Sequence, residues 1–258
     1  MTGISRMQMD HSNLTGRVAV VTGGSNGIGA AVAQRLARAG ASVVVGYHKG
    51  VERAEAVVAS LPGAGHFAQP MVLQETRTLE EAADRAKQLL GGVDILVNAA
   101  GMTKRIPHAD LGALDDTFFD QMLHVNVRGT FAAIRAFMPL LRARGDGVVV
   151  NISSISAFTG SGSNVAYCAA KAALDTMTMS LARALGPEVR FLCVSPAAVA
   201  TDFIEGRSRD ELERGAQTIP LRRVVEPDDV ALAVLGCITH MRMATGTRFI
   251  IDAGRHLI

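Results

Sequence analysis

Tyr167 and Lys171 lie four residues apart in the run NVAYCAAKAALDTMTMSLARAL, whose alanine and leucine content and i, i+3, i+4 apolar spacing predict a helix. Residues four apart share one face of a helix, so we expect the phenol and the ammonium to lie together. A neighbouring cation favours the phenolate and would lower the pKa of the tyrosine from about 10. The pair could therefore serve as a general acid and base.

A hydroxyl group upstream could complete this chemistry. The strand-like run VVVNISS ends in Ser153 and Ser154. A hydroxyl beside the tyrosine could donate to a carbonyl oxygen on which negative charge develops. Taken alone, a Tyr-x-x-x-Lys pair is more often an ordinary pair on a helix surface, so the hypothesis depends on the rest of the chain.

A glycine-rich loop near the start of the chain predicts a binding site for a dinucleotide. The short apolar run GRVAVVTGG precedes it, and GIGAAVAQRLARAG follows with helical spacing as far as Gly40. At such a loop the amides of the helix N-terminus face a pyrophosphate, and glycines let the backbone approach it. The spacing is Gly23-xxx-Gly27-x-Gly29, which differs from GxGxxG.

Five segments occur in an order that resembles the short-chain dehydrogenase/reductase family in its 3-oxoacyl-reductase-like form. They are TGGSNGIG at 22–29, NAAG at 98–101, Asn126, NISS at 151–154 and YCAAK at 167–171. The resemblance extends from about Thr15 to Gly254. It implies an α/β fold with one Rossmann-type, doubly wound parallel sheet of about seven strands and helices on both faces. We expect residues 1–14 to form a flexible extension and 15–258 the single domain.

The resemblance also implies the roles of the catalytic residues. The family's serine precedes its tyrosine by thirteen positions, which selects Ser154 and leaves Ser153 as a strand-end hydroxyl. Lys171 would lower the pKa of Tyr167 and hold the nicotinamide ribose. Asn126, within a helical run from 114 to 141, would hold a water that relays protons to the lysine.

The expected cofactor is NADP(H), with NAD(H) as the alternative. NAD enzymes usually carry an acid about 20 residues past the glycine loop, whereas this chain has Tyr47, His48 and Lys49 after its second strand. A cation there could meet a 2′-phosphate, although His48 and Lys49 could also be ordinary solvated residues. The expected cofactor contacts are Gly23, Ser25, Asn26, Gly27, Ile28, Gly29, Tyr47, His48, Lys49, Asn98, Ala99, Gly101, Tyr167, Lys171, Pro196, Val199 and Thr201.

The chain departs from the family pattern at three positions. Ala99 replaces the second asparagine of NNAG, and Ala197 stands where the family usually has glycine. If that second position needs a positive φ, alanine would cost about 1 kcal/mol. Ala132 replaces a basic residue of carrier-protein reductases, which leaves an acyl-carrier substrate open. The resemblance also implies that the charged segment 202–219 is a mobile lid over the substrate.

Composition restricts the class of protein. The chain has 258 residues, a net charge of +2 and no apolar run near the roughly 18 residues of a membrane span, so neither nucleic acid nor a membrane is an expected partner. Its three cysteines form no CxxC, which predicts no metal site and no disulfide framework and favours the cytoplasm. Cys168 is expected to pack rather than react.

The predicted function is an NADP(H)-dependent oxidoreductase that interconverts a ketone and a secondary alcohol. One alternative is an NAD-dependent alcohol or sugar dehydrogenase, and a remote one is a nucleotide-sensing protein without catalysis. The apolar residues of 170–185 and 114–141, including Met179, Phe131, Ile134, Phe137 and Met138, cover more of each helix than one stripe requires. By resemblance, we expect these faces to pair in a homotetramer.

Overall fold

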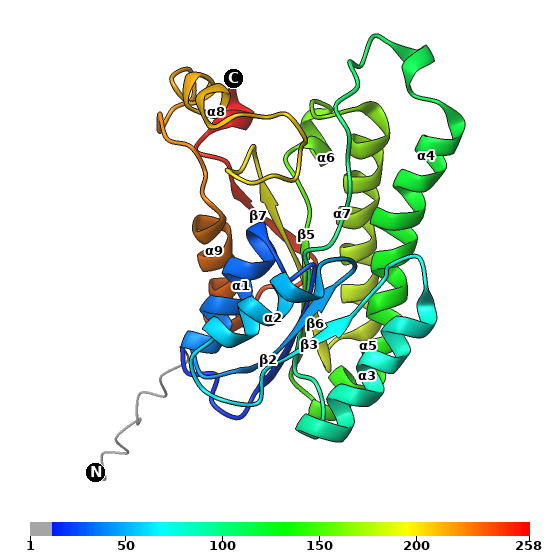
Figure 1. Cartoon of the computed structure of the whole chain (residues 1–258), viewed down its shortest axis with the longest axis vertical. Helices are drawn as coiled ribbons and strands as arrows, with labels where there is room; N and C mark the ends of the chain where they lie inside the picture. Colours follow the sequence, from blue (N-terminus) through cyan, green and yellow to red (C-terminus); the bar gives the residue numbers. More distant parts are fainter. Residues whose placement is uncertain (1–11) are drawn as a thin grey trace, which may run out of the picture.

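The computed structural model describes residues 12–258, in which seven parallel strands form one sheet in the order β3-β2-β1-β4-β5-β6-β7 (Figure 1). Most of these strands are nearly continuous apolar runs, such as VAVVT and GVVVNI, as expected where helices cover both faces. The predicted α/β, doubly wound fold is confirmed. The strands are β1 (Val18–Thr22), β2 (Ser42–Tyr47), β3 (Phe67–Pro70), β4 (Ile95–Asn98), β5 (Gly147–Ile152), β6 (Val189–Pro196) and β7 (Thr247–Ile251).

Helices cover the sheet in two layers (Figure 1). On one side α1 (Gly27–Arg38) packs against α9 (Pro227–Thr239), and α2 (Val51–Ser60) lies over β2 and β3. On the other side α3 (Thr76–Leu90) packs against α5 (Thr130–Arg144), and α7 (Val165–Leu185) lies over β6. Each layer encloses its own apolar cluster. The shorter helices are η1 (Leu111–Ala113), α4 (Asp116–Leu123), η2 (His124–Gly129), α6 (Ser156–Thr159), α8 (Arg209–Ala216) and η3 (Arg255–Leu257).

The strand order creates a crevice at the middle of the sheet. The chain passes from β1 through β2 to β3 at one edge, then returns to β4 on the other side of β1. The connections after β1 and β4 therefore leave in opposite directions, with Thr22 and Asn98 paired at the ends of these two strands. Ligands of open α/β sheets bind at such a switch point.

The run from 114 to 141 differs from the single helix that the sequence predicts. It consists of α4, the π-helical segment η2 and α5, which continues to Arg144. At the junction of η2 and α5, Thr130 Oγ1 donates to the main-chain oxygen of Asn126 at 2.8 Å. A π-turn inside an α-helix is rare and frequently accompanies a functional site, and here it contains Asn126.

The beginning of the domain is packed. Leu14, which the sequence assigns to the extension, is 6% exposed, and its amide donates to the oxygen of Ala39 at 2.7 Å. Leu14 therefore belongs to the core, while residues 1–11 of the predicted extension lie outside the described residues. Among the described helices, none combines the length and the apolar character that crossing a membrane requires.

Candidate active site

The glycine loop between β1 and α1 has the geometry of a pyrophosphate cradle. Gly23 and Gly27 have φ values of 65° and 49°, a region that favours glycine. A Cβ on Gly29 would lie 2.1 Å from the oxygen of Gly23, so the close approach of loop and helix requires glycine there as well. Because α1 begins at Gly27, its free amides face the cavity beyond the loop.

The cavity has a volume of about 1570 Å³ and runs from the glycine loop to the segment between β6 and α8. Drug-sized ligands occupy pockets of roughly 300 to 1,000 Å³, so this space can hold a dinucleotide and a small second molecule. Most of the predicted cofactor contacts line it, namely Gly23, Ser25, Asn26, Gly27, Ile28, Gly29, His48, Lys49, Ala99, Gly101, Tyr167, Lys171, Pro196, Val199 and Thr201.

Three predicted site residues lie beside the cavity rather than on its described wall. Tyr47 packs against the apolar cluster below α1. Asn98 is buried and donates from Nδ2 to Oδ1 of Asn151 at 2.8 Å, which ties β4 to β5. Asn126 is 1% exposed; its Oδ1 accepts from the amide of Met102 at 2.9 Å and its Nδ2 donates to the oxygen of Met102 at 3.0 Å. Asn98 and Asn126 thus position the strands and loop that form the wall.

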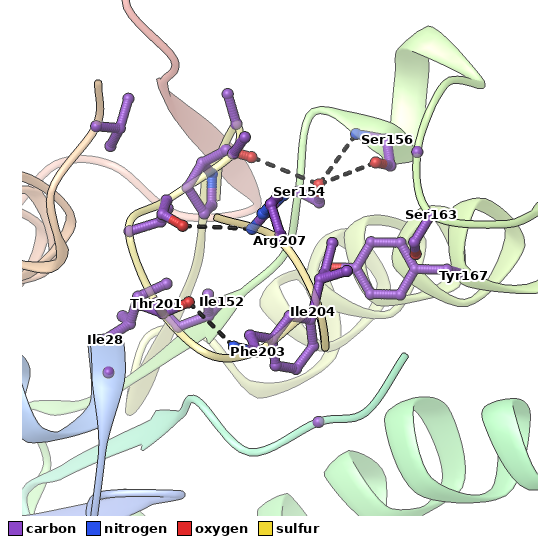
Figure 2. A pocket seen from close by; sticks show the side chains of 18 of the residues that line it. Ile28, Ile152, Ser154, Ser156, Ser163, Tyr167, Thr201, Phe203, Ile204 and Arg207 are labelled. Carbon is purple, nitrogen blue, oxygen red and sulfur yellow. Dashed lines mark hydrogen bonds between the residues drawn. The ribbon is translucent and has the colours of Figure 1, made fainter. Parts of the chain in front are cut away.

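Ser154 follows β5 and is held by several hydrogen bonds. Its Oγ accepts from the amide of Ser156 at 3.1 Å, and its single proton is shared between two acceptors, Oγ of Ser156 at 3.1 Å and the oxygen of Pro196 at 3.4 Å (Figure 2). Ser153 Oγ instead donates to the main-chain oxygen of Lys171 at 3.4 Å. The two neighbouring hydroxyls therefore differ in their partners, and Ser154 is the one beside Tyr167.

Tyr167 lies in the first turn of α7, where Asn164 caps the helix by accepting from the Tyr167 amide at 2.7 Å. Lys171 is one turn further along, with Nζ 5.5 Å from the centre of the Tyr167 ring. Nζ donates to the oxygen of Ile152, at the end of β5, at 2.7 Å. The strand end and the helix are thus joined through the lysine.

The expected lowering of the Tyr167 pKa by Lys171 is not found. Burial raises the pKa of Tyr167 to about 12, and a hydrogen bond with Ser154 and the charge of Arg207 oppose that rise only in part. Burial also lowers the pKa of Lys171 to about 8. Loss of water around the phenol is the largest influence on the pKa of Tyr167, and the ammonium of Lys171 is hydrogen bonded to the Ile152 carbonyl.

The loop after β6 supplies another part of the wall. Pro196, Val199 and Thr201 line the cavity, and a Cβ on Gly27 would lie 3.2 Å from Cγ2 of Thr201. Among residues 12–258, Arg222 and Ala253 are the non-glycine residues with positive φ. Ala197 therefore carries no left-handed strain, and the expected cost of alanine does not arise.

The family resemblance places the segment 202–219 over the substrate but identifies no single residue of it, and the sequence does not identify Arg53. Phe203 and Arg207 come from the loop before α8, and the Phe203 ring lies 6.2 Å from that of Tyr167, tilted by 53° (Figure 2). Arg53, in α2, lines the cavity beside His48 and Lys49. A basic residue four positions after Lys49 was a usable signal, whereas the irregular loop of Phe203 has no periodicity to read.

Cys168 follows Tyr167 in α7 and carries no sign of reactivity. Its thiol is free, and burial raises its pKa. A raised pKa keeps the thiol protonated, and the thiolate is the nucleophilic form. The structure agrees with the prediction that Cys168 packs.

Comparison with known proteins matches residues 17–212 to the model of the short chain dehydrogenase family. A Streptomyces violaceoruber protein assigned as ketoacyl reductase 2 of the granaticin polyketide synthase is 39% identical, over 93% of this chain and 96% of its own. The 3-oxoacyl-acyl-carrier-protein reductase of Aquifex aeolicus is 35% identical over 86% and 90%. A Burkholderia cenocepacia short chain dehydrogenase, solved in complex with NADP, superposes with a TM-score of 0.84 at 35% identity, over 94% of this chain and 98% of its own.

The family match covers well over half of the chain, and these relatives align across most of their lengths. The sheet, the glycine loop and the cavity beside Tyr167 and Lys171 agree with it. The chain belongs to the short-chain dehydrogenase/reductase family and is an NAD(P)-dependent oxidoreductase.

Proposed function

We propose that the chain is an NADP(H)-dependent oxidoreductase that interconverts a ketone and a secondary alcohol at Ser154, Tyr167 and Lys171. One observation carries the proposal: these three side chains line one cavity with the glycine loop that fits a pyrophosphate. The nicotinamide group, when bound, supplies or accepts the hydride. In reduction the protein must then stabilise the negative oxygen and protonate it.

Ser154 and Tyr167 are suited to these two tasks. The Ser154 hydroxyl donates to Ser156 Oγ and the Pro196 oxygen, and its proton can turn from these partners to the substrate oxygen while the Ser156 amide still donates to Ser154 Oγ. With a pKa near 12, Tyr167 is protonated at neutral pH and can donate to that oxygen. The Lys171 charge, 5.5 Å from the ring centre, stabilises the phenolate as the proton leaves.

The remaining catalytic assignment is Asn126, which we place in a proton relay to Lys171. The side-chain amide of Asn126 is hydrogen bonded to the main chain of Met102. The relay would therefore depend on main-chain groups of the π-helical turn η2. Support for this role is the π-turn itself, a form of helix that recurs at functional sites.

The preference for NADP(H) is supported by charge. His48, Lys49 and Arg53 line the cavity after β2, where an acid would otherwise meet the ribose hydroxyls. The cations Lys49 and Arg53 at this place favour a 2′-phosphate. The similar Burkholderia structure contains NADP, in agreement with this proposal.

The substrate class that best fits is a 3-oxoacyl compound. The granaticin and Aquifex relatives carry the names of ketoacyl and 3-oxoacyl reductases. Ala132 lies buried in α5, where carrier-protein reductases usually have a basic residue, so we propose a small oxoacyl compound rather than one attached to a carrier protein.

The test is turnover of 3-oxoacyl substrates by the parent and by Tyr167→Phe, followed through the absorbance of the reduced nicotinamide. We expect Tyr167→Phe to lower kcat by about 10² to 10⁴-fold, because a positioned proton donor contributes that much. Cofactor affinity should stay within a few-fold. Cys168→Ala, in the adjacent position, is the control and should keep its turnover. Near-normal kcat in Tyr167→Phe would refute the assignment, and a parent protein inactive on every carbonyl would favour a nucleotide sensor.

A further inference from the structure

Arg207 extends from the loop between β6 and α8 into the same cavity as Ser154 and Tyr167 (Figure 2). The side chain is half-buried, and its Nη2 donates to the main-chain oxygen of Val199 at 3.3 Å. Its Nε is buried and has no hydrogen-bond acceptor among the described residues. A buried donor without an acceptor is costly and rare, so a ligand atom is a candidate partner.

The charges around Arg207 favour an acceptor that carries negative charge or a strong dipole. Arg105 and Arg255 line the same cavity. Burial lowers the pKa of Arg207 most, and the positive charges of Arg105 and Arg255 lower it further. Glu211 acts in the opposite direction, but its carboxylate accepts a hydrogen bond from Arg105 at 2.8 Å. The neighbourhood therefore contains three guanidinium groups and one carboxylate that is already paired.

The other carboxylates of the cavity do not neutralise this cluster. Glu226 accepts from Arg209, and Asp252 accepts from the ring of His256 at 2.7 Å. Asp202 lines the cavity but is exposed to solvent. An anionic or strongly polar group of the substrate would complete the pairing that the protein leaves unfinished.

The position of Arg207 relates this group to the reacting carbonyl. Arg207 lines the same cavity as Ser154 and Tyr167 and extends toward them (Figure 2). In agreement with this placement, the charge of Arg207 opposes part of the rise that burial causes in the pKa of Tyr167. A substrate whose ketone oxygen meets Ser154 and Tyr167 therefore presents its neighbouring atoms to Arg207. The ring of Phe203, beside that of Tyr167, would cover the apolar part of such a substrate.

We propose that Arg207 binds the acyl oxygen of an oxoacyl substrate, a carboxylate or a thioester carbonyl, and so selects oxoacyl compounds over simple ketones. This inference rests on the proposed carbonyl chemistry at Tyr167. Arg207 then determines specificity for part of the substrate that does not react, and its Nε gains the acceptor that it lacks.

The experiment compares Arg207→Leu with the parent on acetoacetate, a short acetoacetyl thioester and pentan-2-one, which lacks the second oxygen function. We expect kcat/KM to fall about 10- to 100-fold for an oxoacyl substrate, the effect of a hydrogen bond to a charged group. Pentan-2-one should change by less than a few-fold. If kcat/KM falls for acetoacetate alone, the group that Arg207 binds is a carboxylate. If it falls for the thioester alone, the group is the thioester carbonyl. Arg207→Lys, which keeps the charge, should recover part of the loss.

Arg209→Leu is the matched control, because Arg209 is two residues away and its guanidinium is paired with Glu213 and Glu226. It should lower the three kcat/KM values evenly or leave them unchanged. An even loss in Arg207→Leu, with a shifted pH profile on all substrates, would overturn the proposal, since Arg207 would then act through Tyr167. An unchanged kcat/KM of Arg207→Leu on all three substrates would also overturn the proposal.

A binding measurement separates failure of this inference from failure of the proposed function. Propionate should raise the melting temperature of the NADPH-loaded parent but not that of NADPH-loaded Arg207→Leu. This result supports the oxygen-binding site even if the parent reduces none of the three ketones. The inference is contradicted if propionate changes the melting temperatures of both proteins equally. It is also contradicted if propionate changes neither and Arg207→Leu lowers kcat/KM equally for all three substrates.

Discussion

Lys171 is expected to lower the stability of the protein that it serves. Its side chain is 5% exposed, and burial lowers its pKa from 10.5 to about 8. The ammonium is therefore less stable in the folded protein than in the unfolded chain. Replacing it by methionine, an apolar side chain of similar length, should remove this cost together with the catalytic function.

The magnitude follows from the pKa. At pH 7 a fall from 10.5 to about 8 corresponds to about 3 kcal/mol, since each tenfold change in equilibrium constant is about 1.4 kcal/mol. The variant leaves the Ile152 oxygen without the Nζ donor, which costs about 1 kcal/mol. Lys171→Met should thus be more stable by about 2 kcal/mol, or about 4 to 8 °C in Tm for a domain of this size.

The dependence on pH gives the sharper test. Between about pH 8 and pH 10.5 the unfolded chain holds the lysine proton and the folded protein does not, so the parent gains stability as the pH rises. The Tm difference between Lys171→Met and the parent, both without cofactor, should therefore shrink and nearly vanish by about pH 10. A variant that melts below the parent at pH 7, or a difference independent of pH, would refute the reasoning.

Three further predictions concern the cofactor and assembly. Titration should give tighter binding of NADPH than of NADH, and Lys49→Asp should narrow or reverse the gap; equal affinities in the parent would contradict the preference. Gly29→Ala should abolish binding of both cofactors, because its Cβ would lie 2.1 Å from the oxygen of Gly23; retained affinity in calorimetry would exclude the cradle. Light scattering should find a homotetramer, since Phe131 and Met179 are 41% and 46% exposed on α5 and α7; a fully active species of one 27.1 kDa chain would rule it out.

The fold could be predicted because its signals are local. Valine runs followed by helical spacing identify strands and helices one at a time, and the order of the motifs then specifies the sheet. The same holds for the glycine loop, whose positive φ values depend on a few adjacent residues. Tyr167 and Lys171 needed only the four-residue spacing of one helix to be placed together.

Properties that depend on the surroundings could not be predicted from spacing. The pKa of Tyr167 is a case, because the sequence indicates a neighbouring lysine but not how completely the phenol loses water. The exposed part of the apolar surface of α5 is another such property. Ile134 and Phe137 are covered within the chain by the cluster shared with α3, so they leave Phe131 as the exposed part of the predicted face.

The loop before α8 is a part of the site that local sequence patterns did not predict. Its sequence, DFIEGRS, has neither helical nor strand periodicity, so no pattern indicates that Phe203 and Arg207 line the cavity beside Tyr167 while Arg209, at the start of α8, pairs with glutamates. The hydride and proton chemistry needs groups fixed on β5 and α7, whose positions follow from regular structure. Choice of substrate can be made by a loop instead, because a loop can change its side chains without disturbing the sheet. We therefore expect substrate specificity to depend on loop residues such as Phe203 and Arg207, which sequence patterns identify least readily.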